Sequence, residues 1–122
     1  MLIAIVVDLD AWKRNPARYF DAADNDVAEV LGGKVIDFYT ARDGLARDEA
    51  MRSCGLAPQT LMLAATRMGL ASCPMDIFEA NIVKTLLNLP QERETAMFVA
   101  IGKAKADQGM ERMGRLPYDE IV

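Results

Sequence analysis

The segment Ser72–Asp76, written "SCPMD", contains the residue types that most invite a chemical interpretation. It places a thiol, a proline and a carboxylate between two apolar stretches. In one interpretation the segment is a turn and Asp76 caps the following helix, because an aspartate side chain accepts hydrogen bonds from the first N–H groups of a helix. In the other, the backbone of the segment holds a ligand. The residues by themselves leave both interpretations open.

The other candidate reactive groups are cysteines and aspartates, and the chain has no histidine. Cys54 and Cys73 are either a redox pair or two buried structural thiols, and the second is favoured because no lysine or histidine stands beside them to lower a thiol pKa. Asp8 and Asp10 are either a carboxylate pair on one face or a solvated loop entrance. Histidine is the commonest general base and transition-metal ligand. We therefore assign no catalytic side chain and no metal ligand.

Length and charge bound the class of protein. The chain has 122 residues, 52% of them apolar and 26% charged, which suits one globular domain over residues 1–122. The net charge of −4 argues against a nucleic-acid surface, which needs a basic patch. The apolar stretch at residues 2–7 is far shorter than the ~20 residues of a membrane span, and the amino end lacks a signal-peptide pattern. We expect a cytoplasmic protein that binds neither nucleic acid nor membrane.

The hydrophobic pattern predicts an α+β fold in which helices pack on a small sheet. Three apolar runs predict strands, at residues 2–9, 70–75 and 95–104. Asp24 or Asn25 is expected to cap a first helix that runs to residue 41. Gly32 and Gly33 weaken this helix by about 1 kcal/mol each relative to alanine, so a break into two pieces is expected there.

The strongest helical pattern covers residues 45–69, where apolar side chains recur at i, i+3 and i+4. Pro58 lies inside this pattern and has no N–H, so we expect a kink or a restart there, with Gly69 just past the helix end. A third helix is expected from the Asp76 cap to residue 89. The tail, residues 114–122, is expected to run extended over a surface.

Three stretches occur in an order that resembles the carboxy-terminal part of the nitroreductase family of flavin enzymes. They are "RDEAMRSCGLAPQTLMLAATRMGLASCPMD", "LPQERETAMFVAIGKA" and "GRLPYDEIV", and the opening "IAIVVDLDAWKRNP" is similar to the strand that precedes them. The resemblance spans nearly the whole chain. It implies a nitroreductase-like fold with a small antiparallel sheet, truncated at the amino end relative to family members.

The resemblance also implies where FMN is held. The segment that matches Pro74, Met75, Asp76 and Ile77 passes beside the flavin ring, with backbone N–H groups toward N5, which accepts hydride. The arginine that matches Arg115 contacts the flavin phosphate. Ile77 stands where the family often has glycine, and Met113 where a second basic residue is common, with Arg112 as its expected substitute. The family's amino-terminal phosphate site has no counterpart here, so we expect weak or absent FMN binding by this chain alone.

The function implied is that of an FMN-dependent oxidoreductase that passes hydride from NAD(P)H to a nitro or quinone-like acceptor. The alternative is a truncated, flavin-free nitroreductase-fold protein that acts as a dimeric binding or interaction module. In both cases we expect a homodimer. The small and apolar residues of the helix at 46–69 are expected at the dimer interface, and "YDEIV" is expected to add as an edge strand to the partner's sheet.

Overall fold

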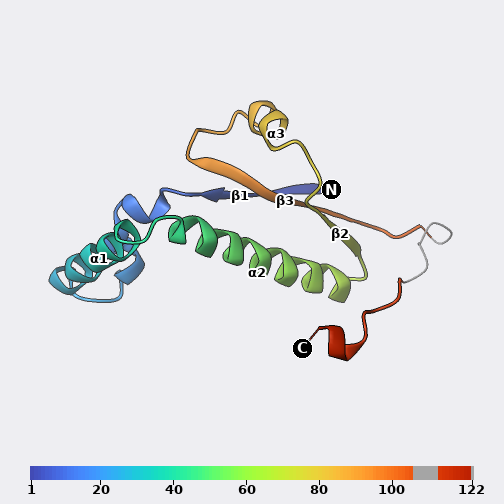
Figure 1. Ribbon diagram of the computed structural model, residues 1–122, viewed down its shortest axis with the longest axis horizontal. Coiled ribbons are helices and arrows are strands. Elements are labelled where there is room, and N and C mark those ends of the chain that lie inside the picture. The colour runs from blue at the N-terminus through green and yellow to red at the C-terminus, as the bar shows by residue number, and fades with distance from the viewer. Residues whose placement is uncertain (106–112, 122) are drawn as a thin grey trace.

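A computed structural model describes residues 1–105 and 113–121 of the chain. Three strands form one antiparallel sheet, and the predicted α+β fold class is confirmed. The sheet has the order β1-β3-β2, so β3 lies in the centre and β1 and β2 are its edges (Figure 1). The strands are β1 (Leu2–Asp8), β2 (Ala71–Met75) and β3 (Arg93–Gly102).

Helices of unequal size lie on the two sides of this sheet (Figure 1). The long helix α2 covers one face, and the short helix α3 lies over the other. The helix α1 extends away from the sheet and packs on a 3-10 segment, η2. The helices are α1 (Asn25–Thr40), α2 (Leu45–Arg67) and α3 (Ala80–Leu86), with 3-10 segments η1 (Ala11–Lys13), η2 (Pro16–Phe20) and η3 (Tyr118–Glu120). None of the helices within the described residues is long and apolar enough to span a bilayer.

The hydrophobic core lies between the sheet and α2. Val99 of β3 has no exposed surface, and it forms a buried cluster with Ile101 and with Ala65 of α2. Partly buried side chains complete this cluster, namely Ile3, Ile5, Leu61, Met62 and Leu70. Fully burying a side chain such as valine stabilises the fold by about 1.5–3 kcal/mol. This layer therefore ties β1, β3 and α2 together.

The predicted break in the first helix is wrong, because α1 runs unbroken through Gly32 and Gly33. Gly32 is buried, and a Cβ atom placed on it would lie 2.8 Å from the backbone nitrogen of Ala17 in η2. The glycine therefore allows η2 to approach the helix closely. This contact explains why a residue that disfavours helix occurs inside one.

The helix α2 follows its predicted course closely, and the predicted strands are also present. It continues through Pro58 without a restart, and Pro58 itself is buried. Gly69 follows the helix end with a φ of 72°, the left-handed conformation predicted for it. Ala57, Ala64 and Met68, which the pattern placed on the apolar face, are exposed. The apolar face that α2 buries is thus narrower than the sequence predicted.

The predicted start of the third helix is wrong. Asp76 does not cap it, because α3 begins at Ala80 with Glu79 at the N-cap, and the Glu79 side chain makes no capping hydrogen bond. The intervening Phe78 packs its ring edge-on against Phe98 of β3, with ring centroids 5.1 Å apart. This contact holds the chain against the sheet and delays the helix. In the tail, Tyr118–Glu120 forms the 3-10 segment η3 rather than a strand in the single chain.

Candidate functional site

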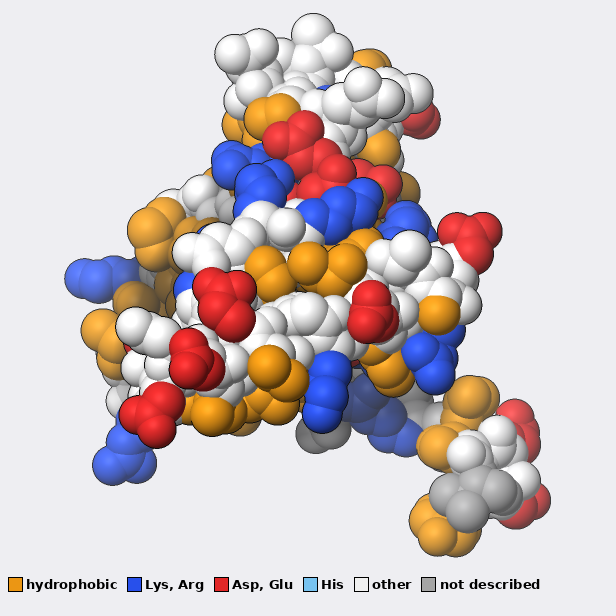
Figure 2. Space-filling view, turned by 90° about the vertical axis from the view of Figure 1, so that its left-hand side faces the viewer, with side chains coloured by type: hydrophobic (Ala, Val, Ile, Leu, Met, Phe, Trp, Pro, Cys, Tyr) orange, Lys and Arg blue, Asp and Glu red, His pale blue; other side chains and the backbone are white. Residues whose placement is uncertain are grey.

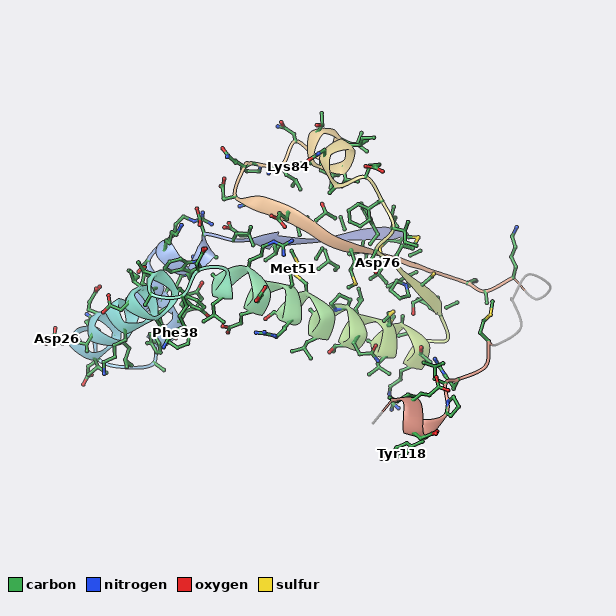
Figure 3. The ribbon with its side chains drawn as sticks, viewed as in Figure 1. Asp26, Phe38, Met51, Asp76, Lys84 and Tyr118 are labelled. Carbon is green, nitrogen blue, oxygen red and sulfur yellow. The ribbon has the colours of Figure 1, made fainter. Side chains whose placement is uncertain are left out.

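The segment that was singled out in the sequence lies where β2 ends and the chain turns toward α3 (Figure 3). Pro74 and Met75 are the last residues of β2 and pair with Val99 and Phe98 of the central strand. Asp76 follows in the turn, and Ile77 has a side chain that is 98% exposed. The structure thus places the four residues at the exposed end of β2 and in the turn that follows it.

The turn carries backbone donors without protein partners. Within the described residues, the N–H groups of Asp76 and Ile77 donate no hydrogen bond to a backbone carbonyl or a side chain. A backbone N–H requires a partner, so exposed groups of this kind bond to water or to a ligand. Because Met75 is fixed in the sheet, the two donors follow directly from a rigid strand end. The arrangement can bind a hydrogen-bond acceptor.

A cleft of about 450 Å³ adjoins Asp76 and is lined by parts of α2, α3 and β3. Met51 and Phe78 contribute apolar surface to it, while Arg47 and Lys84 contribute positive charge. Figure 3 shows Met51 on the sheet-facing side of α2 and Lys84 on α3, on opposite sides of the sheet layer. Sequence reasoning missed this cleft, because three elements far apart in the chain form it and no spacing pattern connects them.

Both cations of the cleft already have partners. Arg47 forms an ion pair with Glu94 at 3.1 Å, and Lys84 donates a hydrogen bond of 2.7 Å to the carbonyl oxygen of Gln91. The Thr95 hydroxyl, by contrast, is buried without a hydrogen-bond partner in the described residues. The cleft is therefore close to neutral in charge and offers no uncommitted cation.

Arg115, the predicted phosphate contact, lies in the exposed tail. No hydrogen bond or ion pair among the described residues connects it to the turn at Asp76. Met113, at the position where a second basic residue was considered, is also exposed, and Arg112 lies outside the described residues. The structure therefore does not bring the predicted ring and phosphate contacts together.

The aspartates at the end of β1 form ion pairs. Asp8 accepts hydrogen bonds from the guanidinium groups of Arg14 and Arg93, and Asp10 pairs with Lys13 at 2.7 Å. Burial alone raises the pKa of the Asp8 carboxyl, but the hydrogen bonds from Arg14, the Asp10 N–H and Arg93 outweigh it and lower the pKa below its ordinary value. Figure 2 shows acidic and basic side chains interleaved below the projecting top of the molecule. These carboxylates are structural, and the described residues contain no acidic or thiol cluster that could hold a metal ion.

The two cysteines are free and lie on different elements. Cys54 is buried in α2, and Cys73 is exposed on β2. Burial raises the pKa of the Cys54 thiol, which keeps it protonated and unreactive at neutral pH. The prediction of a structural thiol is confirmed for Cys54, whereas Cys73 is not buried.

A second group of aromatic residues surrounds Trp12, at the end of the sheet away from Cys73. Trp12 and Tyr39 pack with ring centroids 5.2 Å apart and separate two hollows of about 390 and 370 Å³. The Tyr39 hydroxyl donates a 2.6 Å hydrogen bond to Glu49, and this bond raises the pKa of Tyr39 to about 12. The group fixes the junction between α1 and α2, and no sequence spacing indicated it.

Comparison with known proteins identifies the class to which this fold and turn belong. Residues 9–103 match the sequence profile described as "Nitroreductase family". The chain therefore belongs to the nitroreductase family, and the resemblance found in the sequence is confirmed.

Individual relatives agree with this assignment. The chain is 41% identical over 126 residues to the protein DrgA of Synechocystis sp.. The match covers 100% of this chain and 60% of DrgA. It is 38% identical over 88 residues to MhqN of Bacillus subtilis, named as an NAD(P)H nitroreductase, with 71% of this chain and 43% of MhqN covered. The crystal structure of the nitroreductase ydfN from Bacillus subtilis superposes with a TM-score of 0.86 at 28% identity, over 99% of this chain and 61% of ydfN. The chain thus spans about 60% of the length of such relatives.

Proposed function

We propose that this chain carries the ring-edge part of the flavin site of an FMN-dependent oxidoreductase, which passes hydride from NAD(P)H to a nitro or quinone-like acceptor. The observation that carries the proposal is the pair of unpartnered N–H groups at Asp76 and Ile77, directly after a paired strand, in a member of the nitroreductase family. MhqN is named as an NAD(P)H nitroreductase, and a nitroreductase from Exiguobacterium sibiricum with the same fold is described in complex with FMN. FMN, when bound, supplies the hydride chemistry.

The residues of this chain then bind and orient the cofactor. Pro74 and Met75 fix the end of β2, and the N–H groups of Asp76 and Ile77, which have no protein partner, would donate hydrogen bonds to the polar edge of the ring. The exposed Ile77 side chain lies beside these donors and limits how closely the ring approaches. Helix α3 begins at Ala80 and not directly after Asp76, so its positive end is not placed at the donors.

The phosphate end of the site fits FMN less well. A phosphate group needs several charge-assisted hydrogen bonds, each of which contributes roughly 1.5–3 kcal/mol. Arg47 and Lys84, the cations of the cleft, are already paired, and Arg115 stands alone in the described part of the tail. Loss of two or three such bonds costs on the order of 3–9 kcal/mol, against a binding free energy of about −8 kcal/mol for micromolar affinity. We therefore expect FMN binding by this chain alone to be weaker than micromolar.

Titration of FMN, followed by quenching of its fluorescence, tests this proposal. The expected result is weak, saturable binding that Arg115→Ala weakens by about tenfold, because one charge-assisted hydrogen bond is lost. Arg52→Ala is the matched control, since Arg52 is also exposed but lies on α2, and it should leave the affinity unchanged. Tight, stoichiometric binding would contradict the expected weakness. An affinity that Arg115→Ala does not change would contradict the role of Arg115.

The second candidate function is a flavin-free binding or interaction module. It is favoured by the amount of apolar surface in the described residues, where large side chains such as Leu56, Leu63 and Leu86 are exposed. The same titration separates the two candidates. Complete absence of FMN binding, in a protein shown to be folded by circular dichroism, would favour the module.

Both candidate functions include a homodimer, which we propose forms through the outer face of α2. Leu56 and Leu63 lie seven positions apart, on the same face of this helix, and they are 72% and 61% exposed. Cys54 and Ala65, on the other side of the helix, are buried, and Ala65 packs in the core cluster with Val99, so the outer face is free for a partner. Two such faces are self-complementary, as a twofold contact requires.

A further inference from the structure

The two N–H donors of the proposed site lie in a short turn whose two ends contact the same residue of the central strand. Met75, directly before the donors, is the register partner of Phe98. Phe78, directly after them, packs its ring edge-on against the ring of Phe98, with centroids 5.1 Å apart and the ring planes at 78°. Asp76 and Ile77 thus connect two separate contacts with Phe98.

The contact before the donors is made by the backbone. Ile101 exchanges two backbone hydrogen bonds of 2.8 Å with Met1, on the β1 side of β3. Backbone groups point to alternate sides along a strand, so those of Phe98, three residues earlier, point to β2 and to its partner Met75. Pro74 lacks an N–H and lies at the neighbouring position of β2, where no donor to β3 is required. The sheet itself therefore holds this end of the turn.

The contact after the donors is made by side chains. Val99 packs toward α2, so the ring of Phe98 points to the opposite face of the sheet, where α3 lies (Figure 1). Between Cys73 and Ala80, Phe78 is the one residue that is not exposed. No hydrogen bond among the described residues connects residues 76–80 to the sheet. The Phe78 ring is therefore the contact with the sheet that lies nearest to the donors on this side.

We propose that Phe78 and Phe98 are positioning residues, an aromatic clamp that holds the N–H groups of Asp76 and Ile77 in place for the polar edge of the flavin ring. The clamp rests on the proposed function and adds to it the residues that orient the donors. Edge-on aromatic pairs contribute about two- to tenfold to an equilibrium beyond the area that they bury. An exposed turn without this contact has to be ordered on binding, which weakens affinity by about five- to thirtyfold for each residue fixed.

NMR relaxation of the backbone ¹⁵N nuclei, measured on the full chain without ligand, tests the clamp itself. Order parameters of about 0.85 are expected at Asp76 and Ile77 in the parent chain. Phe78→Leu keeps the apolar volume but loses the ring edge, and it should lower both values below about 0.6. Phe98→Leu should act in the same way, and the double variant should go no further, because each change removes the same contact. Flexible donors in the parent chain, or equally rigid donors in Phe78→Leu, overturn the proposal.

Two further variants separate positioning from general loss of packing. Phe38→Leu is the matched control, since it removes an edge-on contact with Tyr39, at 5.4 Å, on α1 and away from the turn (Figure 3). It should leave the donors rigid. Phe78→Tyr keeps the ring and should restore the parent order parameters. Urea unfolding of each variant completes the comparison, because a Phe78→Leu chain that loses stability while its donors stay rigid shows a purely structural contact and overturns the proposal.

Titration with FMN, followed by the amide shifts of Asp76 and Ile77, distinguishes the clamp from the proposed function. Both amides are expected to shift in the parent chain. Phe78→Leu should weaken the affinity by about five- to thirtyfold, whereas Phe38→Leu should leave it unchanged. Equal affinity of the parent chain and Phe78→Leu overturns the clamp. Absence of any FMN-dependent shift in a parent chain with rigid donors contradicts the proposed function instead.

Discussion

The two faces of the sheet share the same strands but differ in what covers them. The face toward α2 holds the buried cluster around Val99, whereas the face toward α3, which we call the open face, leaves Leu2 and Met75 exposed. Both faces are apolar, so strand sequence does not cause the difference. The covering helices do, since α2 has 23 residues and α3 only seven. An apolar strand with two apolar faces needs a layer on each side, and the described chain supplies one of them in full.

The difference between the two faces determines how rigidly the proposed site is held and how accessible it is. The turn at Asp76 leaves β2 at the border between the two faces, with the completed core behind it and the open face beside it. Its N–H donors are therefore held by a rigid strand and remain accessible from outside.

Adjacent residues of β1 provide the largest expected contrast. Ile3 packs in the cluster beneath Val99, so Ile3→Ala should lower the free energy of unfolding by about 2–4 kcal/mol. Leu2 points to the open face, so Leu2→Ala should change it by less than about 0.5 kcal/mol. Urea unfolding of both variants measures the difference. Equal losses would show that both faces are packed in solution.

The two exposed apolar surfaces should also differ in their effect on assembly. Leu63→Lys introduces a charge into the outer face of α2 and should convert the proposed homodimer into a monomer, as light scattering at micromolar concentration reports. Leu2→Lys introduces the same charge on the open face and should leave the dimer intact. A parent chain that is already monomeric, or a dimer that only Leu2→Lys disrupts, would refute the assignment of α2 to the interface.

A smaller effect on stability is expected at the ion pair between Asp8 of β1 and Arg93 of β3. The pKa of Asp8 is lower in the folded chain than its ordinary value of 3.8, so its ion pairs stabilise the fold above that value and cease to do so as the pH falls through the folded pKa. Asp8→Asn should therefore reduce stability at neutral pH by about 1 kcal/mol. The difference from the parent chain should vanish in acid. Asp10→Asn, which loses only the exposed pair with Lys13, is the control with a smaller loss.

The fold was predictable where the pattern is local and repeated. Residues 2–9 and 95–104 predicted β1 and β3 within two residues at each end, and the i, i+3, i+4 pattern identified α2. The predictions of helix boundaries fail where a contact between residues far apart in the sequence determines the local structure. Gly32 stays helical because η2 packs against it, and Asp76 does not start a helix because Phe78 is held by Phe98. Neither partner is near in sequence, so no local pattern reveals these contacts.

The site was predictable in a different way. The order of motifs identified the family, and with it the turn from Pro74 to Ile77, which the structure places at an anchored strand end. The cleft beside Asp76 was not predictable, because Arg47, Lys84 and Glu94 approach it from three elements. The assignment of Arg115 to the phosphate stays a prediction, as do the cytoplasmic location and the single domain over residues 1–122.

The claim that the sheet is complete on its α2 side and open along its other face and edge has one direct test. Amide exchange in the purified chain, resolved by NMR along β1, compares Ala4 with its neighbours Ile3 and Ile5. The register predicts slow exchange at Ile3 and Ile5, whose N–H groups bond to β3, and fast exchange at Ala4, whose N–H points outward. Equally slow exchange at all three residues would contradict the account, because it would mean that the edge is already covered.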